Sequence, residues 1–195
     1  MKTRRIAAVS AFGALAILAG SCGTKDATGP TIRLTVEEVF ALAGELGAVM
    51  NSYAAASVRS AMSGAHAGGP ARSVAPSTAF RATASCTAGG STTVAGSYVE
   101  STSSASANAT FSYDNCKTVH YTTDGSLSAT GGLIIGQTGV MGQATAGGTL
   151  TVSTADGRSG SCAIDVTVNI TGDFGGNTTY VVSGTACGVK VSGTY

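Results

Sequence analysis

The chain is poor in aromatic, charged and histidine residues, and each shortage excludes a class of protein. Among its 195 residues there is no Trp, aromatic residues make up 6%, charged residues 11%, and His occurs twice. A formal net charge of +1 offers no electrostatic attraction to nucleic acid, and two His leave little material for a His-rich metal site. Yet 43% of the residues are hydrophobic, too many for a disordered charged tail.

The N-terminal segment has the pattern of a secretory leader. Lys2, Arg4 and Arg5 precede an apolar run over residues 6–19. As a helix this run would span about 21 Å, which is shorter than the roughly 30 Å hydrocarbon core of a bilayer. The pattern therefore predicts a cleaved signal peptide over residues 1–21 rather than a transmembrane helix.

The leader ends in Leu18-Ala19-Gly20-Ser21-Cys22, which resembles the lipobox of bacterial lipoproteins, although Ala19 stands where that family most often has Leu. The resemblance implies cleavage before Cys22 and a covalent diacylglyceryl and N-acyl lipid, such as palmitate, on Cys22. No other cofactor is expected. Such an anchor would make the membrane a partner, and Gly23, where Asp would mark inner-membrane retention, implies an outer-membrane lipoprotein on the periplasmic face or the cell surface.

The expected mature chain of 174 residues carries 8 basic and 10 acidic residues, so no nucleic-acid partner is expected. Changes in composition divide the chain into five parts. These are the signal peptide over 1–21, a lipidated N-terminus and tether over 22–34, an amphipathic helix over 35–62, a flexible linker over 63–79, and an antiparallel β domain over 80–195.

The predicted helix opens with a capping box, since Glu38 follows the N-cap residue Thr35 by three positions. Apolar residues recur at the helical period and predict one stripe that packs on the sheet, with Glu45 on the opposite side. The stripe consists of Val36, Val39, Phe40, Ala43, Leu46, Met50 and Tyr53.

The sequence after Phe80 has no Pro and is rich in Thr, Ser, Val and Gly. Alternation of polar and apolar residues, with turn signals such as Asp124-Gly125, predicts short strands joined by hairpins. We expect a mainly β fold, an antiparallel meander forming a curved sheet or a partly open barrel or sandwich, with the N-terminal helix packed on it. The expected strands are 80–86, 91–100, 106–114, 117–123, 126–135, 147–154, 160–171, 178–187 and 189–194.

Four cysteines remain after Cys22, which predicts two disulfides in an oxidising compartment. Three pairings are possible. Cys86 and Cys116 lie symmetrically about a turn near residue 101, and Cys162 and Cys187 about a turn near residue 174, so these two pairs are favoured. The second pair conflicts with the apolar pattern. If Cys162 lay directly opposite Cys187, the apolar residues of the two strands would be offset by one position unless a β-bulge corrected the register.

The mature chain also resembles a broad set of uncharacterised envelope lipoproteins, which combine an acylated tether, one capped helix and a Gly/Thr-rich β-meander. The matching segments are Leu34-Thr35-Val36-Glu37-Glu38, residues 111–116 and residues 184–188. This resemblance implies no activity.

Nothing in the sequence indicates catalysis or a metal site. His66 and His120 are interpreted as ordinary exposed residues, no G-x-S-x-G motif occurs, and the acidic residues near turns fit Asx-turn bonding. The expected function is that of a non-enzymatic envelope lipoprotein with a structural or interaction role and an unknown protein or envelope partner. The alternative is a periplasmic carrier that holds a lipid or other hydrophobic ligand on the concave face of a curved sheet.

Overall fold

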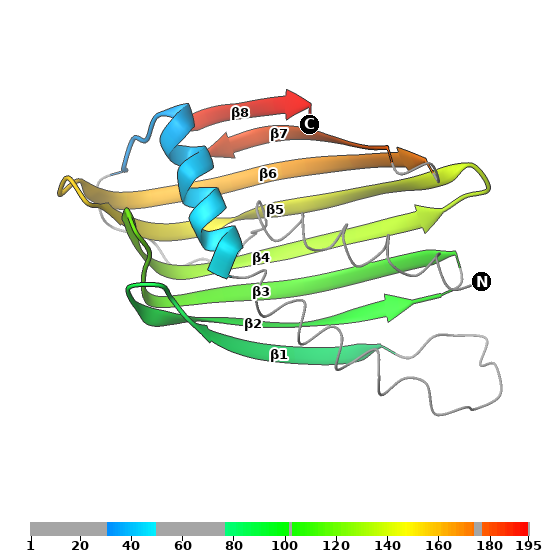
Figure 1. Cartoon of the computed structure of the whole chain (residues 1–195), viewed down its shortest axis with the longest axis horizontal. Coiled ribbons are helices and arrows are strands. Elements are labelled where there is room, and N and C mark those ends of the chain that lie inside the picture. Colours follow the sequence, from blue (N-terminus) through cyan, green and yellow to red (C-terminus); the bar gives the residue numbers. More distant parts are fainter. Residues whose placement is uncertain (1–30, 50–76, 102, 174–176, 195) are drawn as a thin grey trace.

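The computed structural model describes residues 31–49, 77–101, 103–173 and 177–194. Eight strands form one sheet in the order β1 to β8, and each strand pairs antiparallel with the next, so the topology is an open meander (Figure 1). The predicted mainly β meander with one N-terminal helix is therefore confirmed. The strands are β1 (Thr78–Ser85), β2 (Gly89–Glu100), β3 (Ser104–Lys117), β4 (Tyr121–Ile135), β5 (Gly139–Thr154), β6 (Ser159–Asp173), β7 (Thr178–Ala186) and β8 (Val189–Thr194).

The sheet has one apolar and one polar face because side chains alternate along every strand. On β6, Cys162, Val166, Val168 and Ile170 are buried, whereas Asp165 and its neighbours of the same parity are exposed or half-buried. The strand register continues this division across the sheet, placing Leu150 beside Cys162 and Val182 beside Val168. We call the two sides the helix face and the outer face.

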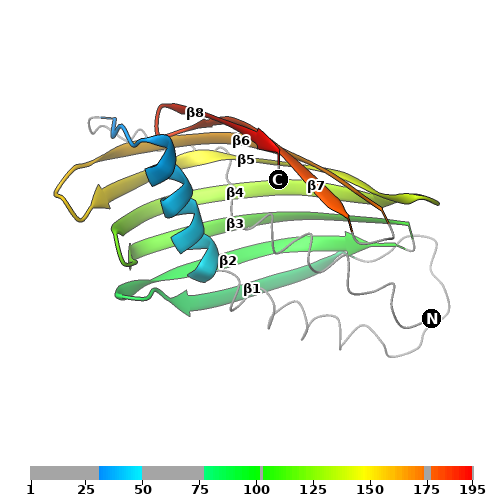
Figure 2. The same cartoon turned by 45° about the horizontal axis from the view of Figure 1, so that its top comes forward.

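The helix of residues 36–49 crosses the helix face near the end of the sheet that carries the β1–β2, β3–β4 and β5–β6 turns (Figures 1 and 2). It begins with the predicted capping box. The Thr35 amide donates to Glu38 Oε2 at 2.7 Å, and the Glu38 amide donates to Thr35 Oγ1 at 3.2 Å. Its apolar contact with the sheet includes Val39, Leu42, Leu46 and Val49, all buried.

The buried stripe of the helix differs from the predicted one. Val36 is 43% exposed and Phe40 38% exposed, whereas Leu42, which the prediction left out, is 3% exposed. The spacing 39, 42, 46 and 49 also follows the helical period, and the Ala- and Gly-rich sequence fits several such stripes, so periodicity alone did not choose between them. Met50, Tyr53 and the predicted extension to residue 62 lie outside the described residues.

The predicted hairpin at Asp124-Gly125 is wrong. Both residues lie inside β4, and the β3–β4 turn comes earlier, at residues 118–120. Gly125 has φ +116°, and Asn115 on the neighbouring strand has φ +45° where the β3–β4 register shifts. The Asp-Gly pair therefore serves a β-bulge, which needs a left-handed backbone as a tight turn does, and two expected strands are one strand.

The folded part of the chain begins earlier than the predicted tether allows. Ile32 and Leu34 are buried in the core, and the Ile32 amide donates to the Ser161 carbonyl at 3.0 Å. Thr31 pairs with Ser161 as an isolated parallel bridge. Residues 31–34 thus belong to the folded part of the chain, and Thr31 and Ile32 lie beside the start of β6. At the other boundary, Thr78 and Ala79 belong to β1 and not to the predicted linker.

One buried hydroxyl in the core carries a stability prediction. Thr123 on β4 is fully buried, and its Oγ1 has no hydrogen-bond partner among the residues that the structure describes. A buried unsatisfied polar group costs about 1–3 kcal/mol, so Thr123→Val, which keeps the β-branched shape, should raise the free energy of unfolding by about that amount. Urea denaturation of the two proteins measures the change. Thr122→Val, one residue away on the outer face, is the control and should shift stability by less than about 0.5 kcal/mol.

Candidate functional site

The four predicted disulfide cysteines are paired as expected. Cys86 bonds to Cys116, with a Cα–Cα distance of 5.4 Å, and Cys162 bonds to Cys187, with a Cα–Cα distance of 4.1 Å. In each pair one cysteine lies in a tight turn, β1–β2 or β7–β8, and the other lies in the strand next to that hairpin, β3 or β6. Each disulfide therefore closes a hairpin, β2–β3 or β6–β7, at its open end.

The expected conflict in the second disulfide does not arise. Val182 lies opposite Val168, the apolar match, and the β6–β7 ladder has no bulge. Cys187 lies one residue beyond the ladder with φ +49°, and its amide donates to the Ala163 carbonyl at 2.8 Å. The turn, rather than a shift of register, brings its sulfur to Cys162.

A polar cluster joins the helix to the turns of the sheet. Arg158, from the β5–β6 turn, forms ion pairs with Glu38 of the helix and, at 2.8 Å, with Asp156 of its own turn. Tyr121 at the start of β4 donates its hydroxyl to the Glu38 carbonyl at 3.0 Å. Burial, followed by the nearby carboxylates of Glu38 and Glu45, raises the pKa of Tyr121, so the phenol remains a donor.

His120 is exposed, as expected, and it also makes a second contact between the helix and the sheet. Its Nδ1 lies 2.5 Å from Glu45 Oε1, and its backbone amide donates to Glu45 Oε2 at 3.2 Å. Glu45 consequently faces the β3–β4 turn, which corrects its predicted place on the opposite side of the helix. In the part of the chain that the structure describes, no Ser, Thr or Cys side chain is hydrogen bonded to the other ring nitrogen. His66 lies outside this part.

The two helix carboxylates should make stability sensitive to acid. The bond from Arg158 and the cap bond from Thr35 lower the pKa of Glu38; burial alone would raise the pKa of Glu45, but hydrogen bonds from Thr118 and His120 outweigh it. A carboxyl whose folded pKa lies below its ordinary 4.5 stabilises the fold above pH 4.5 and loses that contribution as the pH falls through the folded value.

We therefore expect the melting temperature to fall below pH 4.5 in the wild type, and to fall less steeply in the double variant Glu38→Gln/Glu45→Gln. Thermal denaturation between pH 7 and pH 3 measures both slopes. Glu37→Gln, which removes the charge of an exposed neighbour in the first helical turn, is the control for the substitution itself. Equal slopes for the wild type and the double variant would contradict the prediction.

The acidic residues noted in the sequence are used mostly for local backbone bonding. Asp124 Oδ1 accepts the Asn115 amide at 2.6 Å across the bulge, and Asp173 accepts both the amide and the side-chain Nδ2 of Asn177. Within residues 31–49, 77–101, 103–173 and 177–194, no three His, Cys, Asp or Glu side chains gather in a way that could hold a metal ion. Cys22, the predicted lipidation site, lies outside the described residues.

The outer face carries cross-strand rows of uncharged polar side chains that sequence patterns did not reveal. One row, which we call the polar ladder, runs over seven strands from β2 to β8 in direct register. Since neighbouring strands lie about 4.8 Å apart, the ladder extends over about 29 Å. Its members are Ser97, Asn108, Thr130, Thr145, Thr167, Ser183 and Ser192.

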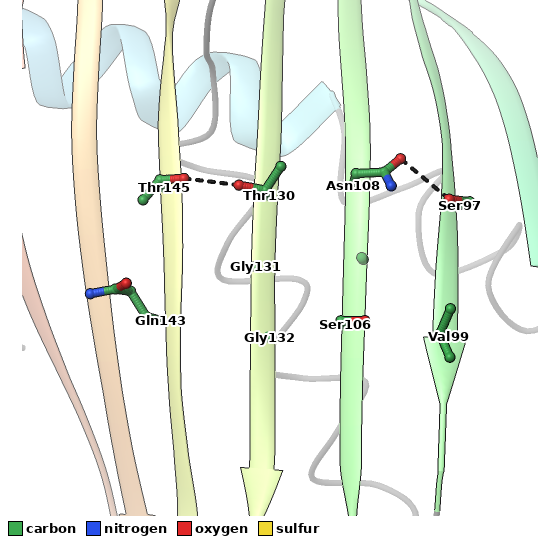
Figure 3. Close-up of a pocket in the computed structure, with 10 residues that line it drawn as sticks. Ser97, Val99, Ser106, Asn108, Thr130, Gly131, Gly132, Gln143 and Thr145 are labelled. Atoms are coloured by element: carbon green, nitrogen blue, oxygen red, sulfur yellow. Dashed lines mark hydrogen bonds between the residues drawn. The ribbon is translucent and has the colours of Figure 1, made fainter. Parts of the chain in front are cut away.

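A shallow groove of about 460 Å³ lies across β2 to β5 on this face. Gly132 leaves its centre without a side chain, while Ser106 and Gln143 flank Gly132 on the two neighbouring strands (Figure 3). The first four residues of the polar ladder line one side of the groove, and Val99 adds an apolar patch. The site offers many hydrogen-bonding groups and no charge.

The groove side chains form hydrogen-bonded pairs, two within the lining and one with Asn169 on β6. Thr130 and Thr145 share a hydroxyl–hydroxyl bond of 2.9 Å, and the Ser97 hydroxyl donates to Asn108 Oδ1 at 3.3 Å (Figure 3). Gln143 donates its Nε2 to Asn169 Oδ1 at 3.0 Å. These bonds fix the direction of the side chains while each hydroxyl and amide keeps further donor or acceptor capacity.

Comparison with known proteins assigns no family or function to the chain, because no family model, no curated protein and no solved structure matches it. The resemblance to envelope lipoproteins thus remains a prediction from the sequence. No helix in the described part of the chain is both long and apolar enough to cross a bilayer.

Proposed function

We propose that the protein is an exported, lipid-anchored component of the cell envelope without enzymatic activity, and that it acts by presenting the outer face of its sheet to a partner. The observation that carries the interaction role is the polar ladder with its groove, an ordered surface of uncharged side chains in direct register across seven strands. The two disulfides support export, since such bonds persist in oxidising compartments.

The non-enzymatic role is supported by how the ionisable groups are used. Two contacts join the helix to the turns, one between Glu38 and Arg158 and one between Glu45 and His120. Both hold the helix against the sheet. The hydroxyls of the groove have no charged neighbour in their two rows that could activate them as nucleophiles.

The packing of the helix weighs against the carrier alternative at this end of the sheet. Val39, Leu42, Leu46 and Val49 are each at most 7% exposed against the sheet, so side chains of the protein itself occupy the space that a carrier would offer to an acyl chain. A carrier would co-purify with lipid. Native mass spectrometry of the exported protein should therefore show the mass of the acylated chain alone, and a bound lipid would favour the carrier.

The anchor itself is tested at Cys22. The wild type should fractionate with membranes and carry the added mass of the lipid, whereas Cys22→Ser should be released and unmodified. Ser21→Ala, which keeps a small residue before the cysteine, is the matched control and should stay in the membrane fraction. A wild-type chain without lipid mass, or a Cys22→Ser variant that remains with the membrane, would overturn the anchor.

A further inference from the structure

The side chains that line the groove on the outer face limit the chemical classes of ligand that can bind there. The polar ladder and the adjoining row over β2 to β8, which contains Val99, Ser106, Gly132, Gln143, Asn169, Val181 and Thr194, include no charged residue. An anion, a cation or a nucleic acid would lose its hydration there without gaining a counter-charge. The ligand that fits these rows is uncharged.

The same groove is too polar to bind a hydrocarbon chain. Hydroxyls and amides from four strands line it, and covering them with an apolar chain would leave donors and acceptors without partners. A folded protein partner fits poorly as well, because the core of a protein interface is enriched in aromatic residues and the lining contains none. What remains is a neutral molecule with many hydroxyls of its own.

The edge of the groove adds a second requirement. On the outer face the next cross-strand pair is Ile134 with Met141, which are 61% and 60% exposed. Together with Val99 they place apolar surface beside the hydroxyls and amides. A sugar ring has this mixed character, since hydroxyl groups project from its rim and C–H groups cover its faces.

We infer that this groove binds an uncharged glycan chain, whose hydroxyls bond to Asn108, Thr130 and Gln143 and whose C–H surface contacts Val99. The inference rests on the proposed interaction role of the outer face and is independent of the lipid anchor. The polar ladder extends beyond the groove over β6 to β8, so a chain of several sugars would lie across the strands, and one ring would occupy the centre over Gly131 and Gly132.

Gly132 provides a variant that closes the groove while preserving the fold. A Cβ atom at this position would meet the Ala105 carbonyl oxygen at 3.6 Å and Ser106 Cβ at 3.9 Å, which are ordinary contacts. Gly132→Val should therefore fold, because valine suits a strand better than glycine does, and its side chain would fill the centre of the site. Ser126→Val is the matched control, because Ser126 is exposed on the same strand and face but lies outside the groove.

The test is an NMR titration of the full exported chain, labelled with ¹⁵N and held in a detergent without a sugar headgroup. Maltohexaose and cellohexaose are the neutral probes, and a heparin hexasaccharide is the charged one. We expect at least one neutral probe to shift the backbone amides of groove residues. Gly132→Val should weaken this binding at least tenfold, Asn108→Ala and Gln143→Ala should weaken it several-fold, and Ser126→Val should leave it unchanged.

Three results would overturn the inference. These are no amide shift with either neutral probe, shifts of equal size with heparin, and shifts that follow protein concentration in the absence of sugar, which would assign the face to contact between copies. Circular dichroism checks that Gly132→Val is folded, and the two alanine variants test the site independently of it. Membrane fractionation of the same cells reports on the anchor separately, so failure of one proposal is distinguishable from failure of the other.

Discussion

Replacing Leu42 with Ala is expected to lower the free energy of unfolding by about 2–5 kcal/mol. Leu42 is 3% exposed in the contact between helix and sheet, and the truncated side chain would leave a cavity that a rigid, disulfide-linked sheet cannot collapse to fill. Thermal denaturation with the disulfides intact measures the effect. A domain of this size should lose several degrees of melting temperature for each kcal/mol.

Val36→Ala is the matched control for this experiment, because Val36 belongs to the stripe that the sequence predicted but is 43% exposed. Its replacement should change stability by about 0.5 kcal/mol or less. If the two variants have the same melting temperature, the helix is a detached spacer, and its capping box and polar contacts do not contribute to the stability of the sheet.

Removing the second disulfide should have an effect of similar size. The double variant Cys162→Ala/Cys187→Ala is expected to lose about 2–5 kcal/mol, because the bond closes a segment of the chain with a sequence separation of 25 and both cysteines are 0% exposed. Urea denaturation of exported protein measures the loss, and non-reducing peptide mapping confirms that Cys86 and Cys116 remain linked in the variant.

The corresponding variant of the first disulfide, Cys86→Ala/Cys116→Ala, provides a comparison. Its sequence separation of 30 is close to that of the second, and in the chain-entropy model such a small difference changes the stabilisation by only about 0.1–0.2 kcal/mol. Two similar losses would support that model. A wild-type free energy of unfolding in either variant would mean that the bond does not form in the exported protein.

The sequence predicted those features that depend on neighbouring residues. Thr35 and Glu38 identify a capping box by spacing alone, and alternation along residues 162–170 reveals a strand with one buried face. The disulfides could also be predicted, because in a meander two cysteines equidistant from a turn come together. Each of these features is decided within one element or one hairpin.

Features that depend on several elements at once could not be predicted. Whether Asp124-Gly125 makes a turn or a bulge depends on Asn115 in the neighbouring strand, whose own left-handed backbone completes the irregularity. The polar ladder needs the register of seven strands. Splitting β4 in two would have misaligned Thr130 with Asn108 and Thr145, so the outer face could not be reconstructed from patterns of alternation.

The stripe of the helix shows the same limitation. Phe40 and Leu42 are both apolar and both fit a helical period, so the sequence of the helix alone does not decide which of them faces the sheet. In the structure Leu42 is buried, and in the same orientation of the helix Glu38 contacts Arg158 and Glu45 contacts His120 in the facing turns. The missing information lies in the strands and turns that face the helix.

The disulfides and the contacts of the helix all lie at one end of the described sheet. This end carries the β1–β2, β3–β4, β5–β6 and β7–β8 turns. Near these turns lie both disulfides, the helix with its contacts to Arg158 and His120, and the bridge at Thr31. At the opposite end, the Ser101–Ser104 turn is held by local hydrogen bonds. Local unfolding begins where few such constraints act, so the strands should fray from that far end inward. The described sheet is then held at one end. The protection of its backbone amides against hydrogen exchange should decline along each strand with distance from that end.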